Sequence, residues 1–344
     1  MNTHTPDFQN LLDVLARRPT AKPVLFEFIM NQGHIERLSG GALNYDLTDG
    51  APNLRVVMKA FQTAGYDYMF APPWLFKAMG FSGKTRDHDQ SVGMAHGGVI
   101  VDRASFEAYA WPDPAKTDWD VLRRITPDLP DGMKVIVCGP GGVLETLTSL
   151  MGFEELCMTL DDDQELLHEI TDAIGSRILK FYEGALQHGC VGAVMVNDDW
   201  GFKTQPFLSP DQMREFITPW HRRMVEVIHK AGRPALLHSC GNLKLLWDDI
   251  IDDLKFDGKH SYEDTILPVE EAYETYGSRI AILGGIDVDF LCRSTPEQIR
   301  RRCTAILEQT MPRGGYGLGS GNSIADYIPA ENFDALRAAA LEFS

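Results

Sequence analysis

The sequence is short of positive charge. Its 344 residues carry 32 lysine and arginine side chains against 49 aspartate and glutamate side chains, a formal net charge of −17. A chain this acidic has no large cationic field with which to hold a phosphate backbone, so we expect no nucleic acid partner. The same deficit disfavours binding to an anionic membrane surface.

Long apolar runs are also missing. No stretch reaches the roughly 18 apolar residues of a membrane-spanning helix, so we expect none. Residues 1–19 lack the apolar core and basic flank of a signal peptide, and residues 8–15 instead have the spacing of a short amphipathic helix. The six cysteines are scattered and do not resemble a disulfide framework, which favours a reducing, cytoplasmic location.

What the chain does contain is a regular alternation of short apolar runs with longer helical segments. Runs that are apolar throughout are typical of strands buried on both faces of a parallel sheet. Eight such runs interleaved with helices predict a (β/α)8 TIM barrel. The doubly wound open sheet is weakened as an alternative, because no G-x-G-x-x-G turn follows an early strand. The predicted strands are Val24–Ile29, Asp67–Ala71, Lys134–Gly139, Gly192–Asp198, Ala235–Cys240, Phe256–Glu263, Ile280–Ile286 and Tyr316–Ser320.

Two helix starts can be read directly from the sequence. Ser209 and Thr295 each precede a proline, and Gln212 and Gln298 stand at the third helical position after them. This is the pattern of a capping box with proline in the first turn.

Two other segments are predicted from composition. Residues 161–187 are expected to form one long helix that starts with three acids and is closed by Gly189. Residues 79–114 interrupt the alternation, and we interpret them as an antiparallel hairpin inserted beside the barrel mouth. No repeat or linker is visible, so residues 1–344 are predicted to form a single domain.

The sharpest chemical motif is the pair His238 and Cys240, at the carboxyl end of the fifth predicted strand. Residues two apart on a strand point to the same side, and barrel enzymes place their catalytic groups at this end. An imidazole and a thiolate on one face are good zinc ligands. A buried histidine beside an inert cysteine is an equally weighted alternative.

A zinc site needs at least one more protein ligand. Glu263 ends the next predicted strand and is the nearest acidic candidate, and His260 is another. Asn197, Asp198 and Asp199 end the fourth predicted strand, where successive side chains point opposite ways, so only one aspartate is expected to face the mouth. It would serve as base, metal ligand or partner of the histidine, unless it merely caps a helix.

Three further stretches suggest walls of a pocket. The turn at residues 138–142 is glycine-rich but lacks the lysine of a P-loop, so a structural turn is favoured over an anion site. In the second glycine-rich stretch, Gly319, Gly321 and Asn322 are candidates for contact with a cofactor. The aromatic group Phe70–Phe76 is expected to wall an apolar pocket or to pack in the core.

The order of these motifs resembles the uroporphyrinogen decarboxylase superfamily over most of the chain, a resemblance that implies the same (β/α)8 barrel. The stretches that carry it are GPGGVLETLTSLMG, NDDWG, FLSPDQMREFITPW, LLHSCGN, HSYEDTILPVEEA, LGGID and GLGSGNSI followed by PAEN.

The superfamily has a decarboxylase branch and a branch of zinc- and cobalamin-dependent methyltransferases. The two arginines with which the decarboxylase branch grips substrate carboxylates fall on Asn31 and Ile35, its acid after the second strand is missing, and its late histidine falls on Ser320. An octa-anionic porphyrinogen needs cationic anchors, so these departures disfavour true uroporphyrinogen decarboxylase activity.

The methyltransferase branch matches better, because His238 and Cys240 resemble its zinc pair and Glu263 matches an acidic position that follows. The third ligand of that branch, a cysteine, falls on Ser320, which leaves Glu263 to complete the site. The resemblance implies a methyl group moved between a corrinoid (cobalamin) protein and a small acceptor at zinc, with Asn197 and Asp199 lining the pocket.

In this interpretation Ser320 and Asn322 contact substrate, and a homodimer is possible by analogy with the decarboxylase branch. Two other hypotheses remain open: a decarboxylase acting on a smaller carboxylate, and a non-catalytic binding subunit.

Overall fold

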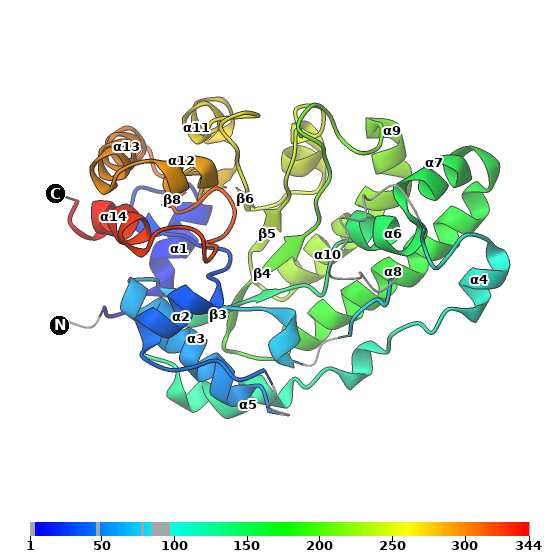
Figure 1. Ribbon diagram of the computed structural model, residues 1–344, viewed down its shortest axis with the longest axis horizontal. Coiled ribbons are helices and arrows are strands. Elements are labelled where there is room, and N and C mark those ends of the chain that lie inside the picture. Colours follow the sequence, from blue (N-terminus) through cyan, green and yellow to red (C-terminus); the bar gives the residue numbers. More distant parts are fainter. Residues whose placement is uncertain (1–3, 46–48, 77–78, 84–96, 344) are drawn as a thin grey trace.

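The structure is a computed structural model that describes residues 4–45, 49–76, 79–83 and 97–343. Its centre is one sheet of eight parallel strands with helices packed around it (Figure 1). Every strand falls within one residue of a predicted apolar run, so the prediction of a TIM-barrel-like α/β fold is confirmed. The strands are β1 Val24–Leu25, β2 Tyr68–Ala71, β3 Lys134–Cys138, β4 Val191–Asn197, β5 Ala235–His238, β6 Gly258–His260, β7 Ala281–Leu283 and β8 Tyr316–Leu318.

The strand order is β1-β8-β7-β6-β5-β4-β3-β2, which is the cyclic order of a barrel with its first and second strands at the two ends. Within the described residues no ladder of backbone hydrogen bonds joins β1 to β2. Side chains bridge this seam instead. The Tyr68 hydroxyl accepts a hydrogen bond from the Glu27 amide at 2.6 Å and donates one to the Glu27 carbonyl at 2.7 Å, and the rings of Phe26 and Tyr68 lie 5.7 Å apart.

Helices surround the sheet, and the first and last of them lie on the same side of the molecule (Figure 1). This follows from the pairing of β1 with β8, which brings the two ends of the chain together. The α-helices are α1 Phe8–Leu15, α2 Gln32–Ser39, α3 Ala51–Ala64, α4 Arg103–Ala108, α5 Asp120–Ile125, α6 Val143–Met151, α7 Phe153–Asp162, α8 Gln164–Ala185, α9 Pro210–Gln212, α10 Thr218–Lys230, α11 Val269–Tyr276, α12 Val288–Arg293, α13 Pro296–Thr310 and α14 Ala330–Leu341. The short 3₁₀ segments are η1 Pro73–Phe76, η2 Pro114–Lys116 and η3 Thr126–Asp128, and the π-helical turns are η4 Met213–Ile217 and η5 Asp249–Asp253.

Both predicted capping boxes are present. The side chains of Ser209 and Thr295 accept from the amides of Gln212 and Gln298, whose own side chains reach back to the cap amides. Helix α1 covers the amphipathic segment predicted near the start of the chain. No helix in the described part of the chain has both the length and the apolar character needed to cross a membrane.

Two predictions about elements are wrong. The predicted helix over 161–187 is divided at Asp163, whose carboxylate accepts from the Leu166 amide and caps α8, so two of the three acids end the preceding helix. The helix ends at Ala185, with Leu186 as its C-cap, and Gly189 does not close it. The predicted hairpin over 79–114 is not found: residues 84–96 lie outside the described residues, and the rest contains helix α4 and no strand. Asp102 and Ser105 form a capping box there, which favours a helix.

Candidate metal centre

Three potential metal ligands meet at the carboxyl ends of β4 and β5. They are Asp199, His238 and Cys240, and their ligand atoms all lie within 4.8 Å of one another. His238 Nε2 is 3.7 Å from Cys240 Sγ and 3.9 Å from Asp199 Oδ1. Asp199 also accepts a hydrogen bond from the Cys240 amide at 2.7 Å, which connects the loop after β4 to the loop after β5. The predicted approach of His238 and Cys240 on one face is confirmed.

A second histidine determines which nitrogen of His238 faces this cluster. His260 Nε2 lies 3.3 Å from the Ser320 carbonyl, which can only accept, so this nitrogen carries the proton. Its other nitrogen, Nδ1, then accepts from His238 Nδ1 at 2.9 Å. We infer that the unprotonated Nε2 of His238 points toward Cys240, as a metal ligand must.

The surroundings keep both rings neutral and fixed in place. Burial is the main cause that lowers the pKa of His238 well below 6.5 and the pKa of His260 to about 3. Phe28 stacks on His238 with ring centroids 4.0 Å apart and planes 15° apart. The imidazole therefore has little freedom to turn away from the cluster.

Cys240 is the sulfur donor of the cluster. Its Sγ lies 3.2 Å from Ser261 Oγ and accepts a hydrogen bond from Asn322 Nδ2 at 3.3 Å. Burial, together with the charge of Asp199, raises the pKa of the thiol to about 12, while burial raises the pKa of Asp199. A bound cation would reverse this trend, because a coordinating thiol loses its proton.

The donor set fits zinc. Nitrogen, sulfur and oxygen ligands bound at about 2.0–2.3 Å around a tetrahedral ion lie roughly 3.3–3.8 Å from one another. The two distances from His238 Nε2, 3.7 and 3.9 Å, are close to that range. Three protein ligands also leave a fourth position, which is the arrangement of catalytic rather than structural zinc.

The neighbouring aspartates have different partners, as the strand pattern predicts. Asp198 is fully buried, and its carboxylate accepts the amides of Leu144 and Glu145 at the start of α6 at 3.0 and 2.9 Å. The helix amino terminus behind the glycine-rich turn therefore holds a carboxylate of the chain itself, which agrees with the structural interpretation of that turn. Asp199 faces the metal cluster instead.

Ser320 does not turn its hydroxyl toward the cluster. The Oγ atom bonds Glu27 Oε1 at 2.6 Å, and the Ser320 amide donates to Glu27 Oε2 at 3.1 Å. Its carbonyl is the acceptor for His260. Ser320 is thus placed behind the second histidine, and a direct contact with substrate stays a prediction.

The two glycines beside Ser320 approach neighbouring strands closely. A Cβ atom on Gly319 would lie 1.6 Å from the Phe26 carbonyl oxygen, and one on Gly321 would lie 2.3 Å from the Tyr262 carbonyl oxygen. Packing within the barrel therefore explains both residues. Their predicted contact with a cofactor stays a prediction.

The remaining predicted residues are divided between the centre and its edge. Asn322 reaches the Cys240 sulfur, and Asn197 ends β4 beside the centre, where its Oδ1 accepts from the Cys138 thiol at 3.0 Å. Glu263 lies outside the cluster, with its carboxylate 3.8 Å from Lys203 Nζ. Among the described residues, Asp199 rather than Glu263 accompanies the histidine and the cysteine.

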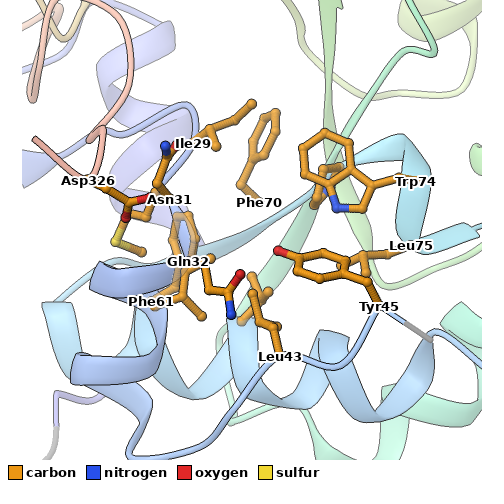
Figure 2. A pocket seen from close by; sticks show the side chains of 14 residues that line it. Ile29, Asn31, Gln32, Leu43, Tyr45, Phe61, Phe70, Trp74, Leu75 and Asp326 are labelled. Carbon is orange, nitrogen blue, oxygen red and sulfur yellow. The ribbon is translucent and has the colours of Figure 1, made fainter. Parts of the chain in front are cut away.

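An apolar pocket of about 740 Å³ lies next to the metal centre (Figure 2). Tyr45 and Trp74 form one side of it, and Asn31 and Asp326 lie on the other. The described lining contains no lysine or arginine, and it confirms that the Phe70–Phe76 segment walls a pocket. The lining residues are Ile29, Met30, Asn31, Gln32, Ile35, Leu43, Tyr45, Val57, Phe61, Phe70, Pro72, Trp74, Leu75 and Asp326.

One ring separates this pocket from the metal centre. Phe28 packs edge-on against Phe70 of the pocket wall, with ring centroids 4.9 Å apart. The same ring stacks on His238 of the metal centre. Asn31 and Ile35, where the decarboxylase branch has arginines, both line the pocket. The pocket therefore offers apolar surface and amides where that branch offers cations.

Two residues of this site, Glu27 and Phe28, were missed in the sequence, and a third, His260, was considered in another role. Glu27 and Phe28 follow β1, and His260 was weighed as a metal ligand, whereas it lies behind the candidate ligand His238. The signal for Glu27 was available, because it is a lone acid within the apolar run VLFEFIM. No spacing rule links it to Ser320, 293 residues later.

Comparison with known proteins agrees with this architecture. A family model described as uroporphyrinogen decarboxylase (URO-D) matches residues 59–343. A solved structure described as a methyltransferase from Methanosarcina mazei superposes with a TM-score of 0.71, covering 97% of both chains at 17% sequence identity.

Curated relatives fall into two activity classes. A methylated-thiol–coenzyme M methyltransferase of Methanosarcina mazei is 26% identical over 206 residues, which is 60% of this chain and 52% of the relative. A uroporphyrinogen decarboxylase of Pseudoalteromonas translucida is 25% identical over 186 residues, 53% of this chain and 50% of the relative. The aligned parts thus span about half the length of these relatives. The family model covers most of the chain, and the chain belongs to the uroporphyrinogen decarboxylase (URO-D) family.

Proposed function

We propose that this chain is a methyltransferase that moves a methyl group between a corrinoid protein and a small acceptor at a zinc ion. Asp199, His238 and Cys240 would hold the zinc. The observation that carries the proposal is the convergence of these three donors, with the Nε2 lone pair of His238 aimed into the cluster by His260. The methyltransferase among the curated relatives supports the choice of reaction.

Zinc at this position would act as a Lewis acid that lowers the pKa of a bound thiol or hydroxyl of the acceptor. The residues of the chain have separate tasks around it. His260 holds His238 in one tautomer, Phe28 restrains the ring, and Asn322 donates to the sulfur of Cys240. The apolar pocket behind Phe28 is proposed to receive the carbon skeleton of the methyl donor or acceptor.

The composition of that pocket argues against uroporphyrinogen as the substrate. Each unpaired carboxylate that is moved out of water costs about several kcal/mol, even after the protein and the penetrating water have relaxed around it. The described lining has no cation, and it contributes one more acid, Asp326. A decarboxylase of a smaller substrate is the second candidate, supported by the decarboxylases among the relatives.

A non-catalytic subunit is the weakest of the three hypotheses. It predicts that His238 and Cys240 are packed apart, with no pocket nearby. Their ligand atoms lie 3.7 Å from each other, beside a pocket of about 740 Å³. The methyltransferase proposal includes a corrinoid partner. It also includes roles toward substrate or cofactor for Asn197, Ser320, Gly319 and Gly321.

Elemental analysis of the purified protein tests the metal centre. We expect about one zinc per chain, lost in His238→Ala, Cys240→Ser and Asp199→Asn. Cys157→Ser is the matched control, because this cysteine is exposed and remote from the cluster.

Glu263→Gln separates the two candidates for the third ligand. Zinc retained in this variant but lost in Asp199→Asn supports Asp199. Zinc lost only with Glu263→Gln would restore the ligand set expected from the family resemblance. A wild-type protein without zinc after growth in zinc-supplemented medium would contradict the proposal.

A further inference from the structure

A buried lysine lines a second pocket, on the opposite face of β6 from the metal centre. Successive side chains on a strand alternate between faces. His260 points into the barrel, where it contacts His238, and Lys259 points the other way. The pocket has a volume of about 850 Å³ and is bounded by the loops after β5 and β6 and by helix α11. We call it the Lys259 pocket.

Lys259 is only 3% exposed, and the groups whose charges favour its protonated form are Cys240 and Asp199 of the metal centre and Glu263. Its ammonium donates to the Ser261 carbonyl and lies over the rings of Tyr262 and Trp247, at 4.3 and 5.7 Å from their centroids. Among the described residues no carboxylate lies within 4.0 Å of it, so it has no ion pair there. A buried cation with one carbonyl acceptor retains unused hydrogen-bonding capacity.

The other charges of the pocket lie toward solvent. Lys244 and Glu271 are exposed, and Glu263 is partly exposed beside Lys203. Water and salt screen such groups far more than they screen a buried ammonium. The deep part of the pocket therefore carries a single positive charge, which matches an anion with one negative charge better than a dianion.

The walls define the rest of the ligand. Trp247 and Tyr276 are stacked, with ring centroids 3.9 Å apart and planes 10° apart. Leu243, Ile266 and Leu267 add aliphatic surface. Such a wall favours a compact apolar body attached to the charged group.

We propose that the Lys259 pocket binds a small monocarboxylate with an apolar body, whose carboxylate pairs with the buried ammonium of Lys259. The proposal does not depend on methyl transfer, since no step of that reaction involves Lys259, although the charges of Cys240 and Asp199 in the metal centre act on the lysine. Burial lowers the pKa of Lys259 to about 8, so the ammonium is still largely protonated at pH 7. The pocket adjoins Gly241 and Ser261, which flank the metal centre, and a bound carboxylate would lie near that site.

Calorimetric titration with three probes tests the site on the full wild-type chain at pH 7. Benzoate has the charge and the apolar body, benzamide is its neutral counterpart, and inorganic phosphate has charge without a body. We expect benzoate to bind at least tenfold more tightly than benzamide and phosphate. Equal affinity for benzoate and benzamide, or tighter binding of phosphate, would overturn the proposal.

A matched pair of variants locates the binding. Lys259→Met replaces the ammonium with an apolar chain of similar length and should remove the preference for benzoate over benzamide. Lys244→Met removes an exposed lysine at the rim and should change the benzoate affinity less than twofold. A Lys259→Met protein that binds benzoate like the wild type contradicts the assignment.

Thermal unfolding at or above the wild-type temperature would show that Lys259→Met is folded. If that variant fails to fold, the comparison of benzoate with benzamide on the wild-type chain still decides the proposal. Because these measurements need neither metal nor turnover, a failure of the methyltransferase proposal would not affect their outcome.

Discussion

At the scale of single residues, the metal centre depends on a chain of hydrogen bonds that starts outside it. The chain runs from the Ser320 carbonyl through His260 to His238. Because the carbonyl can only accept, His260 carries its proton on Nε2, and His238 in turn carries its proton on Nδ1. In the proposed zinc site His260 would therefore be a positioning residue, which acts on the metal through another side chain.

Replacing His260 with phenylalanine should weaken zinc binding by about 10- to 100-fold, the usual effect of losing a partner of a ligating histidine. Phenylalanine fits among the rings of Phe26 and Phe28, which contact His260 now, but it cannot accept the proton of His238. Competition with a chromogenic chelator measures the affinity. His168→Gln, at an exposed histidine, is the control, and equal affinities in the two variants would contradict the role of His260.

Glu27 makes a prediction about pH. Burial raises its pKa from 4.5 to about 8, so between these values the folded chain keeps a proton that the unfolded chain has released. Its contribution to stability is therefore complete below pH 4.5 and is lost as the pH rises to 8, with an upper limit of about 5 kcal/mol.

Glu27→Gln removes this titration, since glutamine is neutral at every pH. The variant should be most destabilised relative to the wild type near pH 5, and the difference should shrink toward pH 8. Urea unfolding at pH 5, 6, 7 and 8 measures it. A difference in unfolding free energy that stays constant over this range would show that Glu27 is ionised in the fold.

At the scale of elements, the Tyr68 hydroxyl supplies two hydrogen bonds across the seam between β1 and β2. Tyr68→Phe removes the hydrogen bonds to the Glu27 amide and carbonyl and leaves both buried groups without that partner. We expect a loss of about 1–3 kcal/mol in unfolding free energy. Hydrogen exchange should quicken at the Glu27 amide first.

The chain supplies a matched control two residues away. Tyr66 is equally buried, and within the described residues its hydroxyl has no hydrogen-bond partner. Tyr66→Phe should therefore leave stability unchanged or raise it slightly. If both variants lose the same free energy, the seam bond has no special role.

Some elements of the fold could be predicted from the sequence, and others could not. All eight strands were predictable, because strands covered on both faces are apolar along their whole length. The break at Asp163 was not, because an acid serves equally well in the first turn of a helix or as its cap. The sequence narrowed the choice of the aspartate that faces the mouth to Asp198 or Asp199. The nearness of Asp199 to Cys240 depends on loop geometry that no spacing in the sequence encodes.

At the scale of the whole molecule, the surplus of 17 negative charges lies on a chain whose apolar pocket beside Phe28 has no cation in its described lining. The single-domain organisation, a homodimer and a cytoplasmic location stay predictions. Zinc binding can be followed through the stability of the whole chain, since a ligand that binds only the folded state raises the unfolding free energy.

Zinc at a free concentration 100-fold above its dissociation constant should raise the unfolding free energy by about 2.7 kcal/mol. Urea unfolding with zinc and with a chelator measures the difference. His238→Ala should show no such difference, and a gain of the same size in that variant would place the stabilising zinc elsewhere.

The two adjacent aspartates after β4 connect the metal centre to helix α6. Asp198 clamps the first amides of α6, and Asp199, one peptide bond later, is a ligand candidate. We expect a shift of the Asp199 carboxylate toward a bound ion to change the hydrogen bonds that the adjacent Asp198 accepts from α6. The amide signals of Leu144 and Glu145 should therefore report occupancy of the metal centre without any probe at the centre itself.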